Sequence, residues 1–194
     1  TATYQPSTSY SFSSSTTLYA VWDANSYTLT INPNGGKYNN TTSNTTVTRD
    51  YGTTYTVANP TPPSGYKVTF NGNNGTPETS SLTSTKSFSS WSKSGSGSLS
   101  GTTYTFGAGT GTLTANYTNN SITLPNATRS GYQFAGWYTS ASGGSRVGGN
   151  NSSYTPTATT TLYAHWTPNT YTNKFNGNGA TSGSMSNMIM TYDT

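Results

Sequence analysis

The chain lacks cysteine and has few charged residues, and these two absences exclude several kinds of site. Without cysteine there is no disulfide framework, thiolate metal site or thiol nucleophile. Charged residues make up only 6% of the 194 residues, and the eight Lys and Arg residues form no basic stripe of the kind that binds nucleic acid. No apolar run approaches the roughly 18 residues that a membrane-spanning helix needs. We therefore expect no nucleic-acid partner and no membrane span.

Large aliphatic side chains are also scarce, and aromatic side chains take their place. Leu, Ile, Val and Phe together number only 21, whereas the chain has 16 Tyr and 4 Trp. More than half of the residues are Thr, Ser, Asn or Gly. Thr and Tyr favour strands, and Asn and Gly favour tight turns. This composition predicts an all-β fold with hairpins and aromatic cores, and a surface so polar and so poor in charge is typical of extracellular proteins.

Short repeated motifs organise the chain. The pattern Leu-Tyr-Ala-x-Trp occurs at 18–22 and again at 162–166, and a weaker copy, Leu-Thr-Ala-Asn-Tyr, occurs at 113–117. In each copy large apolar residues alternate with small or polar residues. This alternation predicts a strand, which we call the closing strand.

Two further motifs accompany the closing strand. An alternating strand that runs into an Asn/Gly turn begins at Tyr27, Tyr66 and Tyr171, and it predicts a hairpin because Asn and Gly tolerate positive φ. A Phe-x-x-Trp motif occurs at 88–91 and 134–137. The order along the chain is hairpin, Pro-rich turn, Phe-x-x-Trp, Gly/Ser loop and closing strand.

This order divides the chain into four repeat units or parts of units. We expect the end of one unit at 1–26, a long unit at 27–117, a short unit at 118–166 and the opening hairpin of a further unit at 167–194. The first residues have none of the features of a signal peptide. We expect the sequence to be a piece of a longer protein.

Three of these motifs together resemble a known family. They are Phe-Asn-Gly-Asn-Gly at 175–179, Gly-Tyr-x-Phe-x-Gly-Trp-Tyr at 131–138 and Thr-Leu-Tyr-Ala-x-Trp at 161–166. Taken as the hairpin, the Trp-bearing strand and the closing strand of one repeat, they resemble the Listeria–Bacteroides repeat, which occurs in internalin B-repeats and in many large bacterial surface proteins. The resemblance implies small β-grasp-like modules in tandem, in an extracellular protein that is often attached to the cell wall. The family has no established catalytic residues that map onto this chain.

The recurring large residues are expected to form the structural cores of the modules, because one buried Trp or Tyr removes roughly 150–250 Å² from water. These residues are Leu18, Trp22, Trp91, Phe134, Trp137, Leu162 and Trp166. The same Trp residues could instead stack on sugar rings. Tyr138 and Tyr163 are the candidate glycan contacts, since Tyr138 alternates with Trp137 and should face the opposite side of its strand.

The residues offer little for catalysis or metal binding. The four carboxylates are scattered along the chain: Asp23, Asp50, Glu78 and Asp193. The only histidine, His165, occupies a position that Val21 and Asn116 fill in the other closing strands, which favours an outward-facing strand position. A Lys–Asn isopeptide link would need a buried lysine beside a carboxylate, and Lys67 and Lys174 are the candidates. We expect no enzyme activity, no cofactor and no metal site.

The sequence favours a structural repeat segment of a bacterial extracellular stalk or filament. Its partners would be neighbouring repeat modules or identical chains. The closing strand in 1–22 and the hairpin in 167–194 could complete each other between two chains and build a fibre. The alternative that these boundaries have no meaning stays open. A glycan- or host-binding adhesin module is the alternative from another functional class.

Overall fold

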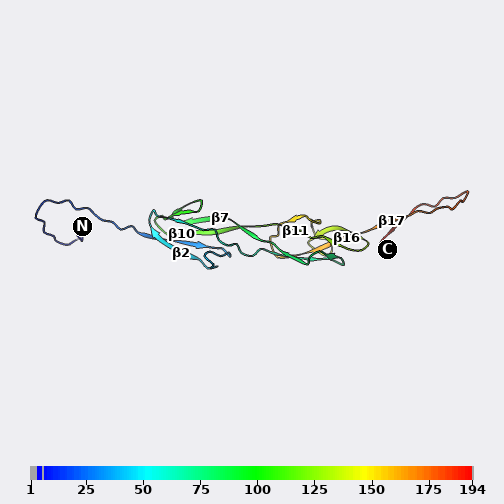
Figure 1. Ribbon diagram of the computed structural model, residues 1–194, viewed down its shortest axis with the longest axis horizontal. Helices are drawn as coiled ribbons and strands as arrows, with labels where there is room; N and C mark the ends of the chain where they lie inside the picture. The colour runs from blue at the N-terminus through cyan, green and yellow to red at the C-terminus, as the bar shows by residue number, and fades with distance from the viewer. Residues whose placement is uncertain (1–3, 6, 194) are drawn as a thin grey trace.

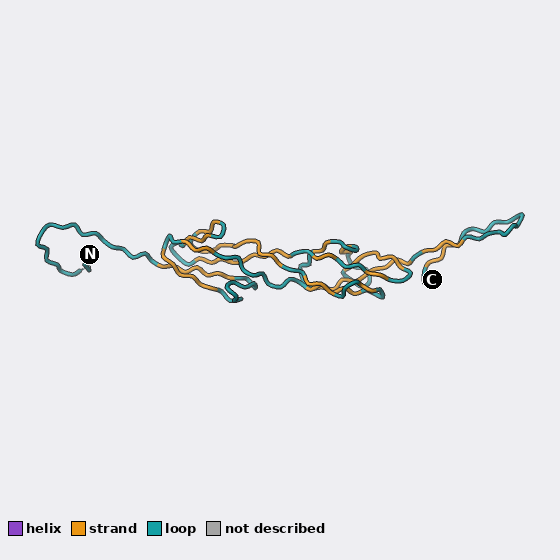
Figure 2. The backbone as a smooth tube through the Cα atoms, viewed as in Figure 1, coloured by secondary structure: helices purple, strands orange, loops and turns teal. Residues whose placement is uncertain are grey.

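The computed structural model describes residues 4, 5 and 7–193, and every helix or strand in this part of the chain is a β-strand. The strands form an elongated body of two modules arranged end to end (Figure 1). A segment without strands extends from one end of this body, and a two-stranded hairpin extends from the other (Figure 2). The predicted all-β class is confirmed. The described residues contain no helix long and apolar enough to cross a membrane.

The first module combines a four-stranded sheet with a three-stranded sheet. The larger sheet has the order β2 (Thr45–Asp50), β1 (Ser26–Asn32), β10 (Gly111–Asn119) and β7 (Lys86–Gly95). The smaller sheet has the order β3 (Thr54–Thr56), β9 (Thr103–Thr105) and β8 (Ser98–Ser100). β1 and β10 run parallel, and all other neighbours in these sheets run antiparallel.

The second module is built around a five-stranded sheet. Its order is β14 (Arg146–Gly148), β13 (Tyr132–Tyr138), β16 (Thr160–Pro168), β4 (Lys67–Asn71) and β6 (Ser81–Thr83). Two short pairs complete the module: β11 (Ile122–Thr123) with β15 (Ser153–Tyr154), and β12 (Ala127–Thr128) with β5 (Thr76–Pro77). Again the closing strand, β16, lies parallel to the first strand of a hairpin, β4.

The strands of both modules pair in the same register. Ile31 lies opposite Leu113 in the first module, as Phe70 lies opposite Leu162 in the second. Likewise Trp91 lies opposite Ala115, as Trp137 lies opposite Ala164. The hairpin strand therefore always places a large apolar residue beside the Leu of the closing strand. The strand that bears Phe-x-x-Trp always places its Trp beside the Ala.

The two modules interlace along the chain. Strands β4, β5 and β6 belong to the second module, but they precede β7 to β10, which complete the first module. The chain consequently passes between the modules three times, at 57–66, 84–85 and 120–121. Parallel strands need a long crossover connection, and here the crossover between β1 and β10 contains the hairpin of the next module.

The packing units therefore differ from the units read along the sequence. The first module combines 26–57 with 86–119, and the second combines 66–83 with 122–168. The division at 117/118 remains a description of the repeats in the sequence, and the sheets do not follow it.

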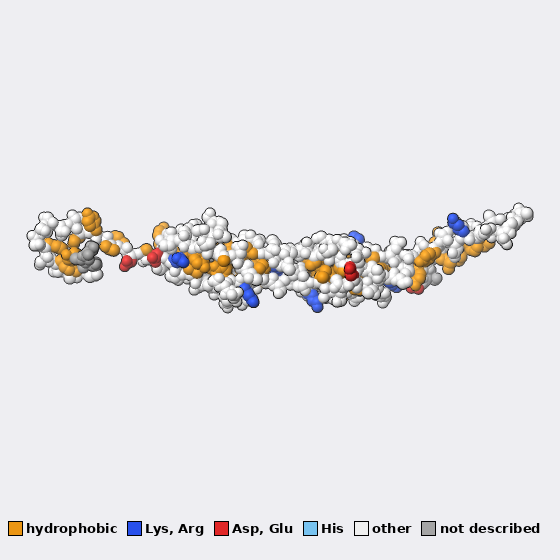
Figure 3. All heavy atoms as spheres, viewed as in Figure 1, with side chains coloured by type: hydrophobic (Ala, Val, Ile, Leu, Met, Phe, Trp, Pro, Cys, Tyr) orange, Lys and Arg blue, Asp and Glu red, His pale blue; other side chains and the backbone are white. Residues whose placement is uncertain are grey.

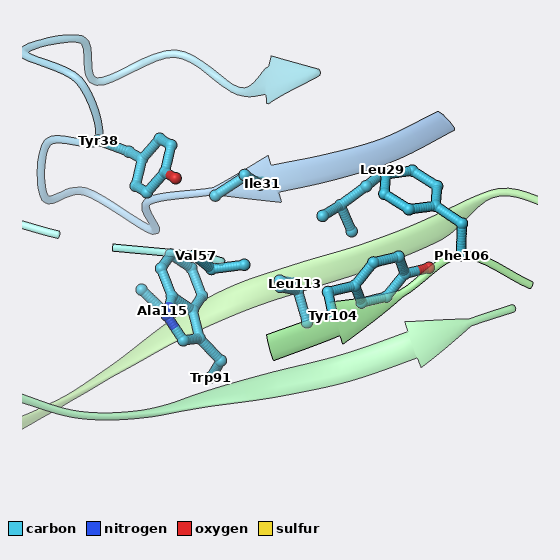
Figure 4. Close-up of a cluster of buried hydrophobic side chains, with 9 residues drawn as sticks. All are labelled: Leu29, Ile31, Tyr38, Val57, Trp91, Tyr104, Phe106, Leu113 and Ala115. Atoms are coloured by element: carbon cyan, nitrogen blue, oxygen red, sulfur yellow. The ribbon is translucent and has the colours of Figure 1, made fainter. Parts of the chain in front are cut away.

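Each module has its own aromatic core. The first core contains Leu29, Ile31, Tyr38, Val57, Trp91, Tyr104, Phe106, Leu113 and Ala115 (Figure 4). The second core contains Val68, Phe70, Leu124, Ala127, Trp137, Leu162 and Ala164. Trp137 is fully buried, and its indole Nε1 donates a hydrogen bond to the Pro125 carbonyl at 2.9 Å. The main chain at Pro125 thus satisfies the one polar atom of the largest core side chain.

The structure places most of the expected core residues in these cores. Trp91 lies in the first core, Trp137 and Leu162 lie in the second, and Phe134 and Trp166 pack against the second.

Leu18 and Trp22 depart from this expectation, because they are 55% and 87% exposed. They belong to the segment 7–25, which forms no strand, and no hairpin among the described residues lies beside it.

The third hairpin consists of β17 (Thr170–Asn173) and β18 (Met188–Thr191). Its base docks on the second module, where the Tyr192 ring packs against Tyr132 with 5.5 Å between ring centroids. The Asn169 amide donates to the Gly131 carbonyl at 2.9 Å, and a Cβ at Gly131 would collide with Tyr192.

Candidate functional site

In each of the two modules, two hydrogen bonds fasten the closing strand to the turn of its hairpin, and we call this pair the reciprocal lock. In the second module, the Asn73 side chain donates to the Ala164 carbonyl at 3.1 Å. In return, the indole of Trp166 donates to the Gly72 carbonyl at 2.9 Å. The hairpin therefore holds the closing strand, and the closing strand holds the turn.

The first module contains the same lock with a different aromatic residue. The Asn34 side chain donates to the Ala115 carbonyl at 2.9 Å, and the hydroxyl of Tyr117 donates to the Pro33 carbonyl at 2.7 Å. Asn34 and Asn73 both sit at positive φ, 48° and 45°, a conformation that asparagine tolerates better than most residues. The Asn/Gly motif of the hairpin is thus needed for the turn and also supplies a contact to the closing strand.

The three chain passages between the modules are bonded to one another. The Asn120 amide donates to the Thr85 carbonyl at 2.9 Å, and the Asn120 side chain donates to the hydroxyls of Thr85 and Ser87 at 2.8 and 2.9 Å. In the passage at 57–66, the Tyr66 amide donates to the hydroxyl of Ser84, a buried polar residue, at 2.9 Å. The joint between the modules is therefore a cross-linked bundle of three chain segments.

The candidate glycan contacts lie on the outer face of the second sheet. Tyr138 and Tyr163 are directly opposite each other on β13 and β16, on the face away from Trp137 and Ala164. Both tyrosines are half-buried. Tyr138 thus faces away from the core, as the alternation along the strand predicts.

His165 belongs to the same face and fixes the position of Tyr138. Their rings stack with centroids 3.9 Å apart and an angle of 8° between the planes. The Nε2 atom of His165 is 2.9 Å from the Ser140 carbonyl. Arg146, which lies opposite Tyr138 on β14, donates from Nε to the Ala135 carbonyl at 3.0 Å. We call this group the aromatic platform: it consists of the stacked rings of Tyr138 and His165, with Tyr163 opposite Tyr138 on β16 and Arg146 opposite it on β14.

The equivalent face of the first module has no aromatic residue. The shared register places Ser92, Thr114 and Asn116 where the second module has Tyr138, Tyr163 and His165. The Asn116 side chain donates to the Ser92 hydroxyl at 2.7 Å. The aromatic platform is therefore a property of the second module alone, and the first module provides a natural control.

Three tyrosines of the first module, two of them buried and one half-buried, hold their hydroxyls in structural hydrogen bonds. Burial, together with a hydrogen bond to Tyr55 at 3.1 Å, raises the pKa of Tyr38 to about 12. Burial also raises the pKa of Tyr104 and of Tyr117, and the hydroxyls of both donate to main-chain carbonyls. These shifts keep the hydroxyls protonated, which suits hydrogen-bond donors in a core.

Charged groups are few and dispersed on the face shown in Figure 3. Within the described residues no three His, Asp or Glu side chains gather at a place that could hold a metal ion. Lys67 and Lys174 are exposed, so neither is the buried lysine that an isopeptide link requires.

Sequence reasoning missed the lock and the joint. Asn34 and Asn73 stand at one position of a recurring motif, so an interaction that repeats with the motif could have been suspected. Asn120 has no such signal, because it lies in a two-residue linker whose partners come from another passage of the chain.

Comparison with known proteins gives one match. Residues 100–165, about a third of the chain, match the model of the Listeria-Bacteroides repeat domain. No curated protein and no solved structure matches. The matched segment runs from the closing strand region of the first module through β11 to β15 and most of β16. The resemblance inferred from the motifs is confirmed over this segment.

Proposed function

We propose that this chain, with its Listeria–Bacteroides repeat at 100–165, is a structural segment of a bacterial extracellular stalk or filament. Repeats of this family are a feature of bacterial surface proteins, which supports the extracellular location. The observation that supports the structural role most strongly is the interlaced joint, with its three chain passages bonded to one another. On this proposal the protein is not an enzyme. It acts as a spacer that holds other parts of the stalk or filament at a distance from each other.

The joint suits a spacer because it limits bending. Two domains on a single linker move freely unless a large apolar interface joins them. Here three passages connect the modules, and two of them contain only two residues each, at 84–85 and 120–121. A bend would have to stretch at least one short passage and break the hydrogen bonds of Asn120.

The strands also suit a load along the rod. They run along the long axis of the body (Figure 1), so a pull on Ser26 and Pro168 would load the parallel pairs β1–β10 and β4–β16 in shear. Shear strains many hydrogen bonds of a ladder at once, whereas peeling breaks them one after another.

Single-molecule fluorescence energy transfer tests the rigid joint. The cysteine-free chain allows dyes to be placed at two exposed positions, with Ser43→Cys in the first module and Ser142→Cys in the second. We expect one narrow distance distribution. A matched pair with Ser13→Cys in the strandless segment and Ser43→Cys should give a broad one. A distribution between the modules as broad as that control would contradict the proposed function.

A glycan-binding adhesin module is the second candidate, and the aromatic platform supports it. Flat, fixed rings such as the stacked pair Tyr138 and His165 are the kind of surface on which sugar rings pack. On this candidate Tyr138→Ala weakens binding on a glycan array by about tenfold. Ser92→Ala, at the equivalent position of the first module, should leave binding unchanged. Equal effects of the two variants, or no binding to begin with, would count against it.

A further inference from the structure

The third hairpin lacks the neighbour that the other two hairpins have. The first strands β1 and β4 each pair with a second strand of their own hairpin on one edge and with a parallel closing strand on the other. β17 pairs with β18 alone, and its other edge meets no strand of the described residues. An open edge of this kind is a template for an added strand.

The turn of this hairpin already has the conformation that a lock requires. Asn178 has φ 44°, and its amide donates to the Asn176 side chain at 3.0 Å, as Asn73 does to Asn71 at 2.9 Å. The Ala180 amide donates to the Gly177 carbonyl at 3.0 Å and closes the turn as in the other two hairpins. The register of the three hairpins aligns Asn178 with Asn73, the residue that holds a closing strand in the second module.

The apolar residues of the third hairpin are uncovered. Phe175 occupies the position of Ile31 and Phe70, yet it is 46% exposed while these two are 0% and 3% exposed. Met188, Ile189 and Met190 of β18 are exposed as well. These residues are as exposed as the apolar residues of the other hairpins would be without their closing strands.

A closing-strand motif that pairs with no hairpin among the described residues lies at the other end of the same molecule. Residues 18–22 repeat the Leu-Tyr-Ala-x-Trp pattern of β16, but all five are exposed. In β16 the corresponding Leu162 and Ala164 are 1% and 0% exposed. Because this segment and β17 lie at opposite ends of the body (Figure 1), they can meet only between two molecules.

We propose that residues 16–22 of one copy of this chain add as a parallel strand to the open edge of the third hairpin of a second copy, along residues 173–176, where β17 ends and the chain continues to the turn. The register of the two modules places Leu18 beside Phe175. Both bonds of the reciprocal lock then form, from the Asn178 side chain to the Ala20 carbonyl and from the Trp22 indole to the Gly177 carbonyl. Such a head-to-tail contact does not close on itself, so it builds a linear filament. This inference deepens the proposed structural role and rests on it.

One position of the third hairpin differs from its counterparts. Ala180 stands where the other hairpins have Gly36 and Gly75, and a Cβ at Gly75 would collide with Trp166. The methyl group of Ala180 therefore lies where the ring of Trp22 should pack. Ala180→Gly should strengthen the contact between copies, and this gain is specific to the proposed register.

Disulfide trapping tests the register, since the chain has no cysteine of its own. Thr17 and Lys174 correspond to Thr112 and Thr30, which lie opposite each other in the first module. The full chain with Thr17→Cys and Lys174→Cys should give a ladder of linked oligomers under mild oxidation. Thr30→Cys with Thr112→Cys is the control that must close within one molecule. Ser15→Cys with Lys174→Cys is out of register by two residues and should link at least tenfold more slowly.

The lock gives the second readout. In the chain with the in-register pair, Asn178→Ala should slow linkage about threefold to tenfold, because it removes one hydrogen bond. Ala180→Gly should speed it. Deleting residues 4–22 from the cysteine-free chain should leave only monomers in sedimentation velocity.

Three results would overturn the inference. They are oligomers that persist after the deletion, absence of a ladder while the control disulfide forms, and a monomeric chain whose hairpin binds a peptide of residues 110–119 instead. The last result would assign β17 to a strand like β10 that another part of a longer protein supplies. In each case a narrow distance distribution between the modules would leave the proposed rod-like spacer standing, so the two ideas can fail separately.

Discussion

Phe70→Ala tests the interlaced arrangement most directly, because Phe70 belongs to one unit by sequence and to the other by packing. It lies within 27–117, but its side chain is 3% exposed in the second core, with its ring centroid 5.0 Å from that of Trp137. Removing a buried Phe side chain costs about 3–5 kcal/mol. A cost of this size raises the opening constant of the affected strands by about two to three and a half powers of ten.

Hydrogen exchange read by mass spectrometry locates the effect along the chain. We expect Phe70→Ala to lower the protection of amides in β4, β13 and β16, and to leave β1 and β10 close to their native protection. Ile31→Ala is the matched control, because Ile31 is fully buried at the equivalent position of the first module. It should lower protection in β1, β7 and β10 first.

The opposite pattern would refute the reasoning. If Phe70→Ala reduced protection throughout β1, β7 and β10 while β13 and β16 stayed protected, then 27–117 would behave as one packing unit. If both variants reduced protection equally in both modules, the joint would couple the cores so tightly that they unfold as one body.

Three further predictions concern single side chains. Asn73→Asp keeps the turn but replaces the amide that donates to the Ala164 carbonyl, and it should lower the free energy of unfolding by about 1–2 kcal/mol in urea titrations; no change would mean that the lock adds nothing. The pKa of Tyr38 is raised to about 12 in the folded state from an ordinary value near 10, so its contribution to stability is complete below pH 10 and is lost as the pH rises toward 12. Melting temperatures from pH 9 to 12 should fall less steeply in Tyr38→Phe, and an unchanged slope would contradict this. Gly131→Ala places a methyl group against the Tyr192 ring at a φ of +76°, and it should release the third hairpin; unchanged hydrogen exchange in β17 and β18 would show that the docking is not needed to order it.

The sequence predicts the parts of this fold better than their assembly. The alternation in 113–117 and 162–166 predicts the closing strands, and both are strands with the expected faces buried. The Asn/Gly turns after Tyr27 and Tyr66 end hairpin strands as expected. These features follow from local periodicity and turn chemistry, which a short window of sequence contains.

The pairing of hairpins with closing strands lies beyond such local signals. Every closing strand offers a Leu and an Ala, and every hairpin offers a large apolar residue and an Asn, so these shared residues do not specify which closing strand pairs with which hairpin. Leu18 and Trp22 show the consequence, because they have the pattern of buried residues yet are exposed, and no hairpin among the described residues lies beside them. The stack of Tyr138 on His165 is similar, since it depends on the irregular pairing at Gly136 between β13 and β16.

Interlacing connects the rigid joint to the capacity for assembly. The second strand of the first hairpin already brings the chain back beside the start of β1, since Asp50 lies opposite Ser26. The closing strand β10 nevertheless does not follow there: the connection from β1 to β10 contains the next hairpin, β4 to β6, and this arrangement produces the three passages of the joint. It also means that hairpins and closing strands arise as separate pieces with one shared register. The pieces without partners among the described residues, 18–22 and β17–β18, share the register of the complete modules, and the strand addition that we propose makes the contacts of those modules except at Ala180, whose methyl group lies where the Trp22 ring should pack.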